Sequence, residues 1–146
     1  MKIFIGSDHR GYKLKSKIKN QKSKVNFEDL GVFSEENADY PIIAEKVANE
    51  VIKNPDSLGI LICGSGQGMC IAANKIKGVR AAIAWNEATA RAGREDDHIN
   101  ILCLSADYVD ETKNLKIIKT FLSATPKNEK RYLRRLSQIQ KIENNS

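Results

Sequence analysis

Residues 58–74 read LGILICGSGQGMCIAAN, an apolar run that leads through a glycine-rich turn into a helical segment. Four further apolar runs have the length of strands: residues 3–5, 25–30, 79–84 and 99–104. Segments with helical spacing alternate with these runs or follow them: residues 12–20, 41–53, 68–76, 86–94, 110–122 and 128–142. This alternation is typical of βαβ units. The sequence therefore predicts a three-layer α/β protein in which helices flank both faces of a five-stranded parallel sheet.

Length and composition fit one globular domain. The chain has 146 residues, of which 41% are hydrophobic and 29% charged. We therefore expect a single domain over residues 1–146 that ends in a helix at about 127–143. No apolar run approaches the ~20 residues that span a bilayer, and Met1–Ile5 is too short for a signal peptide. We expect a cytoplasmic protein with no membrane partner.

The three cysteines are an odd number, and each lies in an apolar segment. A disulfide framework is therefore not expected, and the thiols should be free. Cys70 and Cys103 lie inside a predicted helix and a predicted strand, so we expect them to be buried and inert. Cys63 ends a predicted strand, and its role depends on the loop that follows it.

The net charge of +6 is unevenly distributed along the chain. Residues 1–24 carry eight basic side chains and one acid, residues 113–146 carry nine and two, and the stretch between carries seven and fifteen. One run of lysines has no aromatic residues interleaved: Lys13, Lys15, Lys17, Lys19, Lys22 and Lys24. This run predicts a solvated helix face rather than a nucleic-acid site. A small anionic substrate is compatible with the charge.

Ligands of open parallel sheets bind at the carboxyl ends of the strands, so the residues around the strand ends are candidates for a site. The first candidate segment, residues 6–11, places Asp8 beside His9, one of two histidines. Two interpretations stay open for this pair. Asp8 is either the N-cap of the next helix beside an incidental surface histidine, or both residues belong to a site.

The second candidate segment is the glycine-rich turn of residues 63–68. Its three alternating glycines, Gly64, Gly66 and Gly68, let backbone N–H groups point into one concavity at a helix N-terminus, which suits a phosphate or a developing oxyanion. The turn lacks the Lys-Ser or Lys-Thr of a Walker A loop, and Met69 leaves the dinucleotide fingerprint incomplete. At this helix end Cys63 is either a structural thiol or a base or nucleophile.

Two further groups of residues are candidates. Residues 93–98 place Asp96 and Asp97 beside the second histidine, His98, which is either a polar loop or part of a site. Arg131 and Arg135 are four residues apart and share one face of the last predicted helix. Paired guanidinium groups suit a phosphate, and a solvated basic helix is the alternative.

Together these segments resemble the type B ribose-5-phosphate isomerases and their galactose-6-phosphate isomerase relatives, over nearly the whole chain. The resemblance rests on ordered motifs at residues 6–12, 39–41, 59–68, 71–75 and 78–81 and on the pair Arg131 and Arg135. It implies a Rossmann-like fold with a five-stranded parallel sheet. It also implies a homodimer or dimer of dimers with active sites formed between two subunits, and an isomerase of the pentose phosphate pathway.

The resemblance also implies a role for each matching residue. Aldose–ketose isomerisation through an enediolate needs a base, a proton relay and an oxyanion cradle. Cys63 matches the family's base in its ribose-phosphate members, and Ser65 matches its proton relay. Substrate-binding roles are implied for the following residues: Asp8 and Tyr40 for the sugar and the pocket wall, Gly64, Gly66, Gln67 and Gly68 through backbone amides for the enediolate, and His9, Arg131 and Arg135 for the phosphate. No metal or organic cofactor is implied.

This chain departs from the family pattern at two places. The family reads His-Asn-Asp where this chain reads Asp96, Asp97 and His98. We expect activity to be retained with altered ring opening, carried either by Asp96 in place of the histidine or by His98 two residues later. Asp97 then stands at the position of the sugar-binding asparagine. Asp107 occupies a position where many members carry an arginine that binds phosphate from the partner subunit.

Three functions follow from these observations. The leading one is the interconversion of ribose 5-phosphate and ribulose 5-phosphate. The alternatives are an isomerase of a six-carbon sugar phosphate, such as galactose or allose 6-phosphate, and a sugar-phosphate-binding protein that has lost catalysis. Galactose-phosphate relatives generally lack the cysteine matched by Cys63, which favours the five-carbon substrate. A basic nucleic-acid binder is disfavoured.

Overall fold

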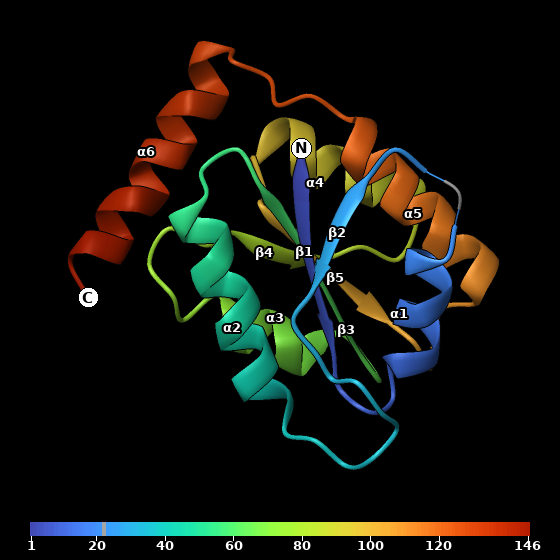
Figure 1. Ribbon diagram of the computed structural model, residues 1–146. Helices are drawn as coiled ribbons and strands as arrows, with labels where there is room; N and C mark the ends of the chain where they lie inside the picture. The colour runs from blue at the N-terminus through green and yellow to red at the C-terminus, as the bar shows by residue number, and fades with distance from the viewer. Residues whose placement is uncertain (22) are drawn as a thin grey trace.

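The computed structural model describes residues 1–21 and 23–146. Its five strands form one sheet in which every neighbouring pair is parallel. The strands are Lys2–Ser7 (β1), Asn26–Asp29 (β2), Leu58–Cys63 (β3), Ala81–Ile83 (β4) and Ile101–Ser105 (β5). Their order across the sheet is β2-β1-β3-β5-β4 (Figure 1). The predicted parallel sheet is confirmed.

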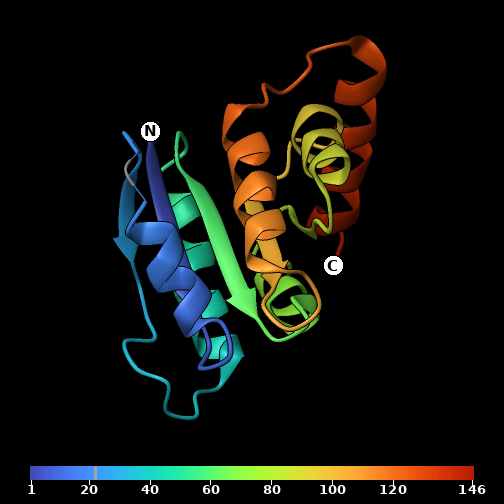
Figure 2. The ribbon, with the colours of Figure 1, turned by 90° about the vertical axis from the view of Figure 1, so that its right-hand side faces the viewer.

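Six helices connect and follow the strands. They are Tyr12–Lys19 (α1), Tyr40–Lys53 (α2), Gln67–Ala73 (α3), Glu87–Asp96 (α4), Glu111–Ser123 (α5) and Lys130–Asn144 (α6). One core packs α1, α4 and α5 against one face of the sheet, and a second core packs α2 and α3 against the other. Figure 2 shows the sheet between these helix layers. The three-layer α/β architecture is therefore confirmed.

The alternation of side chains along the strands produces the two cores. In β1, Ile3 and Ile5 point to the face covered by α1, whereas Phe4 points to the face covered by α2. All six residues of β3 are buried because this strand is central and covered on both faces. The continuous apolar run at 58–63 is what such a strand requires.

The last helix begins later than predicted. α6 starts at Lys130, not at 127 or 128, because Glu129 is its N-cap with extended backbone dihedrals. None of its residues is buried, and it stands outside the three-layer body (Figure 1). None of the helices in the described part of the chain is long and apolar enough to cross a membrane.

The predicted bounds of β5 and the prediction for Lys15 were also wrong. β5 begins at Ile101 rather than 99, because the amide of Ile99 still donates to the carbonyl of Gly93 in the turn that closes α4. Lys15 is 1% exposed, and its ammonium group donates to Asp29 Oδ1 at 2.8 Å and to the carbonyl of Val32. It is therefore not part of a solvated face. Lys22 lies outside the described residues.

Candidate active site

A pocket of about 410 Å³ lies at the carboxyl ends of β1, β3 and β5. β1 has β2 on one side and β3 on the other, so the connections after β1 and β3 diverge at this point. Ligands of open parallel sheets bind at such a switch point. We call this cavity the carboxyl-edge pocket. Its lining residues are Asp8, Arg10, Tyr40, Cys63, Gly64, Ser65, Gly68, Asp107 and Tyr108.

Asp8 both shapes the first turn and lines the pocket. It is 5% exposed, and its Oδ1 accepts hydrogen bonds from the amides of Arg10 at 3.0 Å and Gly11 at 3.1 Å. The N-cap of α1 is Gly11 rather than Asp8. His9 does not line the pocket; its Nδ1 accepts a hydrogen bond from the amide of Ala38 at 3.3 Å.

Cys63 ends β3 in the pocket wall and is held by the turn that follows it. Gly66 has φ +83°, a conformation that glycine adopts without strain. In this turn the amide of Gly66 donates a hydrogen bond to Cys63 Sγ at 3.1 Å. The next residue, Gln67, begins α3. A nearly buried thiol therefore faces the pocket with a backbone N–H group directed at its sulfur.

The rest of the turn supplies a close approach and a hydroxyl group. Ser65 lines the pocket, and its Oγ accepts a hydrogen bond from the amide of Gln67 at 3.2 Å. A Cβ atom on Gly68 would lie 2.6 Å from the ring of Tyr40, so only glycine lets this tyrosine cover the turn. Gln67 is exposed, and neither it nor Gly66 lines the pocket.

The other two cysteines differ from each other, which the sequence did not indicate. All three thiols are free. Cys103 is buried, and its pKa is raised well above the ordinary value by the hydrogen bond to Cys70 and by burial. Cys70 is only partly buried, and the hydrogen bond from Cys103 lowers its pKa to about 7 against the effect of burial. The prediction that Cys70 is buried was therefore wrong, whereas Cys103 is buried as predicted.

The candidates at residues 93–98 lie at the opposite edge of the sheet. Asp96 is the last residue of α4 and Asp97 is its C-cap, ahead of β5. His98 has φ +49°, and its Nε2 lies 2.7 Å from the carbonyl of Lys127. The expectation that they share the strand ends of Asp8 and Cys63 is wrong, because α4 runs back along the sheet and residues 93–98 lie at the amino end of β5.

Arg131 and Arg135 belong to this second region. Arg131 is exposed, and its guanidinium group contacts Glu129 at 3.0 Å and the hydroxyl of Tyr132 at 3.0 Å. Its pKa is raised by the hydrogen bond to Tyr132 and, to a smaller extent, by the negative charges of Glu129 and Asp96. Arg135 follows one turn later on α6 and is exposed. We call these residues the amino-edge cluster: Asp96, Asp97, His98, Arg131 and Arg135. Within one chain they do not meet the carboxyl-edge pocket.

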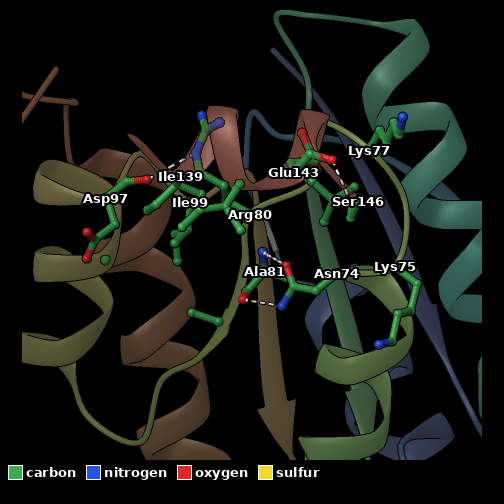
Figure 3. A pocket seen from close by; sticks show the side chains of 14 residues that line it. Asn74, Lys75, Lys77, Arg80, Ala81, Asp97, Ile99, Ile139, Glu143 and Ser146 are labelled. Atoms are coloured by element: carbon green, nitrogen blue, oxygen red, sulfur yellow. Dashed lines mark hydrogen bonds between the residues drawn. The ribbon is translucent and has the colours of Figure 1, made fainter. Parts of the chain in front are cut away.

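The residues of the amino-edge cluster that precede β5 are held by hydrogen bonds and an ion pair from Lys127 and Arg80 rather than by a buried core. Lys127 bonds to α4 through its amide, which donates to the carbonyl of Glu95 at 2.8 Å, and through its ammonium group, 3.7 Å from Asp96 Oδ1. Figure 3 shows the neighbouring cavity of about 620 Å³ beneath α6, where Arg80 Nε donates to the carbonyl of Asp97 at 3.1 Å. These bonds set the position of Asp97 and its neighbours.

Three pocket residues had no predicted role in this position: Arg10, Asp107 and Tyr108. Arg10 lines the pocket and forms an ion pair with Asp107. Asp107 lies in the pocket of its own chain, on the loop after β5. Arg10 lies within the family motif of residues 6–12. The sequence therefore placed it near the predicted site but did not indicate its ion pair with Asp107.

The fold and the pocket define a parallel α/β protein with a small polar site at the switch point of its sheet. The model of the Ribose/Galactose Isomerase family matches residues 3–139, and the chain belongs to this family.

Relatives in this family extend over the whole chain. A Mycoplasma genitalium protein described as a probable ribose-5-phosphate isomerase B is 46% identical over 145 residues, covering 97% of this chain and 95% of the relative. A crystal structure of ribose-5-phosphate isomerase B from Mycoplasma genitalium with bound ribulose-5-phosphate matches with a TM-score of 0.93 at 44% identity, covering 99% of this chain and 97% of that one. The Clostridium thermocellum ribose-5-phosphate isomerase B structure matches with a TM-score of 0.95 at 41% identity and 99% coverage of both chains.

Proposed function

We propose that this protein is an aldose–ketose isomerase that interconverts ribose 5-phosphate and ribulose 5-phosphate. The observation that carries this proposal is the thiol of Cys63 in the carboxyl-edge pocket, with the Gly66 amide directed at its sulfur. The chain is 44% identical to a ribose-5-phosphate isomerase B whose structure holds ribulose-5-phosphate. The six-carbon alternative is disfavoured because of Cys63, as the resemblance implied.

The proposed mechanism uses the groups that line this pocket. Cys63, as thiolate, removes the proton from C2 of the open-chain aldose and returns it to C1 of the resulting enediolate. Ser65 moves a proton between the two substrate oxygens. Backbone amides of residues 64–68 stabilise the negative charge that develops on the enediolate. Asp8 binds sugar hydroxyl groups, and Tyr40 closes one side of the pocket.

We further propose that two copies of the chain complete each site. The amino-edge cluster holds the proposed phosphate ligands Arg131 and Arg135 and the proposed ring-opening group Asp96, and it lies away from Cys63 of the same chain. A second copy brings one chain's amino-edge cluster to the other chain's pocket in a homodimer. Exposed apolar side chains on α6, among them Ile139 and Ile142, support an interface there.

The cellular setting is part of the same proposal. Conversion of ribose 5-phosphate to ribulose 5-phosphate belongs to the pentose phosphate pathway, where we place the protein. Three free thiols, one of them proposed to act as a base, suit the reducing cytoplasm.

The test is the rate of ribulose 5-phosphate formation from ribose 5-phosphate, measured beside the rates on galactose 6-phosphate and allose 6-phosphate. The proposal expects turnover of the five-carbon substrate to exceed that of both six-carbon substrates. Faster turnover of a six-carbon substrate would assign the alternative isomerase. Thermal protection by ribose 5-phosphate without turnover of any of the three would assign the sugar-phosphate-binding protein.

A further inference from the structure

The ion pair between Arg10 and Asp107 lies across the carboxyl-edge pocket. A Cβ atom built on Gly64 would lie 2.9 Å from Arg10 Nε and 2.8 Å from Asp107 Oδ2, so the pair sits directly over the residue that follows Cys63. The two side chains approach from the loops after β1 and β5. Gly64 leaves the space that both of them occupy.

Both partners are anchored through their backbones and not through their side chains. The amide of Arg10 donates to Asp8 Oδ1 at 3.0 Å, and the amide of Asp107 donates to the carbonyl of Gly64 at 3.0 Å. Their Cα atoms are therefore fixed to the pocket while the side chains can rotate. The guanidinium-bearing side chain is 57% exposed and the carboxylate side chain 29%, so water screens the pair and opening it costs little.

Charge makes Arg10 distinctive in this pocket. Among the described residues that line it, Arg10 is the one cationic side chain, and Asp8 and Asp107 are both carboxylates. A sugar phosphate brings about two negative charges at neutral pH. Without a free cation from this chain, the two carboxylates would repel that group. A guanidinium group can donate two parallel hydrogen bonds to the oxygens of a phosphate. A phosphoryl group can therefore take the place of the Asp107 carboxylate on Arg10.

We propose that Arg10 is a substrate-binding residue whose guanidinium group exchanges Asp107 for the phosphoryl group of the sugar phosphate. Asp107 then acts as a built-in competing anion that holds Arg10 over Gly64 in the empty site and lowers the apparent affinity for substrate. This inference rests on the proposed function for the identity of the substrate. It assigns a role to Arg10, which the family motif did not.

The experiment compares Arg10→Gln, Asp107→Asn and the double variant with the wild type. KM and kcat are measured with ribose 5-phosphate, and binding is measured separately as the rise in melting temperature with inorganic phosphate and with ribose 5-phosphate. Arg10→Gln is expected to raise KM about 10- to 100-fold with kcat within about twofold, the loss of a charge-assisted contact. Asp107→Asn is expected to lower KM about two- to fivefold, the scale of a screened ion pair.

The double variant separates exchange from independent effects. Because Asp107 acts mainly through Arg10, Asp107→Asn should lower KM less in the Arg10→Gln background, where it relieves only its direct repulsion of the phosphate, than in the wild type. Arg10→Lys, which keeps the charge and loses the fork, should recover part of the affinity. Lys13→Gln on the neighbouring helix removes an exposed ion pair with Glu35 and serves as the matched control, with KM unchanged.

Two results would overturn the proposal. One is an Arg10→Gln variant that melts at a lower temperature while its affinity for both phosphate ligands stays at the wild-type value, which would make the pair structural. The other is an equal effect of Asp107→Asn with and without Arg10. Because phosphate protection is read without turnover, a wild-type protein that binds ribose 5-phosphate but does not isomerise it would refute the proposed function and leave the role of Arg10 testable.

Discussion

The carboxyl-edge pocket and the amino-edge cluster are built in opposite ways. The pocket draws Asp8 and Cys63 from the ends of two paired, buried strands, and both side chains are at most 5% exposed. The cluster takes Asp96 from a helix end and Arg131 and Arg135 from α6, a helix with no buried residue. The positions of the first region's side chains are thus fixed by the core, whereas the proposed role of the second region depends on a second chain.

The two regions would contribute different steps to the proposed reaction. The group that needs the tightest placement, the base, lies on a central strand. The groups proposed to bind the phosphate and to open the ring lie at the surface, from which they could reach the pocket of a second chain. Substitution of the proposed base should therefore affect the chemical step, and substitutions in the cluster should affect binding and ring opening.

The largest effect is expected at Cys63. Cys63→Ala removes the proposed base and should lower kcat for ribose 5-phosphate by about 10²- to 10⁴-fold, the range for loss of a general base. Protection against thermal unfolding by ribose 5-phosphate should persist. Cys70→Ala is the matched control, since this thiol lies outside the pocket, and it should retain turnover. Turnover of Cys63→Ala at the wild-type rate would remove the cysteine from the mechanism.

The second prediction concerns the ion pair between Lys15 and Asp29, whose side chains are 1% and 11% exposed. Asp29→Asn leaves the Lys15 ammonium group buried without its counter-ion and should lower the free energy of unfolding by about 3 to 5 kcal/mol at neutral pH. Urea unfolding measures this change. Glu28→Gln, which breaks an exposed pair with Lys2, is the control and should change it by no more than about 0.5 kcal/mol.

The same pair gives a pH dependence with a definite sign. Burial acts to raise the pKa of Asp29, but hydrogen bonds from Lys15, Lys19 and the Gly31 amide outweigh it and hold this pKa below the ordinary 3.8. The folded protein therefore binds this proton less readily than the unfolded chain. Stability from Asp29 is fully present above pH 3.8 and is lost as the pH falls through the folded pKa. Asp29→Asn should flatten the decline in urea midpoint between about pH 5 and pH 2; an unchanged slope would contradict the sign.

The buried lysine contributes in the opposite direction. Burial lowers the pKa of Lys15 even though Asp29 acts to raise it. The ammonium group is thus less favourable in the folded protein than in water, while the carboxylate, which has three donors, is more favourable. The stabilising contribution of the pair therefore comes from the Asp29 carboxylate. For this reason the predicted variant replaces Asp29 and not Lys15.

The third prediction tests the amino-edge cluster. Arg135→Ala should raise KM for ribose 5-phosphate roughly 10- to 100-fold, as expected for a lost charge-assisted contact to phosphate. Its melting temperature should stay at the wild-type value because the side chain is exposed. Arg134→Ala removes the exposed arginine beside it and serves as the control for charge alone. Equal KM values for the two variants would refute a specific phosphate contact.

The smallest effect separates the two candidates for ring opening. Asp96→Asn should lower kcat for ribose 5-phosphate about tenfold, near the low end for acid–base groups. His98→Asn should change it by no more than about twofold, because the imidazole is engaged with the Lys127 carbonyl and asparagine tolerates the positive φ. The reverse pattern would assign ring opening to His98.

Local sequence patterns predicted the sheet and the pocket turn because each depends on contiguous residues. The apolar run at 58–63 and the glycines after it predict that β3 ends at Cys63 and that a turn into a helix follows this residue. The place of Asp96 follows from the same pattern, because residues 93–98 precede the strand predicted at 99–104 and so lie at its amino end; the end of α4, two residues past the predicted one, was not predicted. Which edge a loop occupies depends on the direction of the element before it.

Pairings between distant residues could not be predicted from periodicity. Lys15 looks like one of a run of solvated lysines, and only the fold brings Asp29 to it across 14 positions. Arg10 and Asp107 meet through loops after different strands. Such side-chain pairs depend on the three-dimensional arrangement of the strand ends, which no local pattern encodes.

The most direct test of the two-chain site is complementation between inactive variants. Cys63→Ala and the double variant Arg131→Ala/Arg135→Ala are made separately and also co-expressed, and turnover of ribose 5-phosphate is measured for all three preparations. If each site combines one chain's pocket with the other's cluster, the co-expressed protein should recover roughly a quarter of the wild-type rate, since half of randomly paired dimers hold one intact site of two. Co-expressed protein no more active than the separate variants would contradict a site shared between two chains.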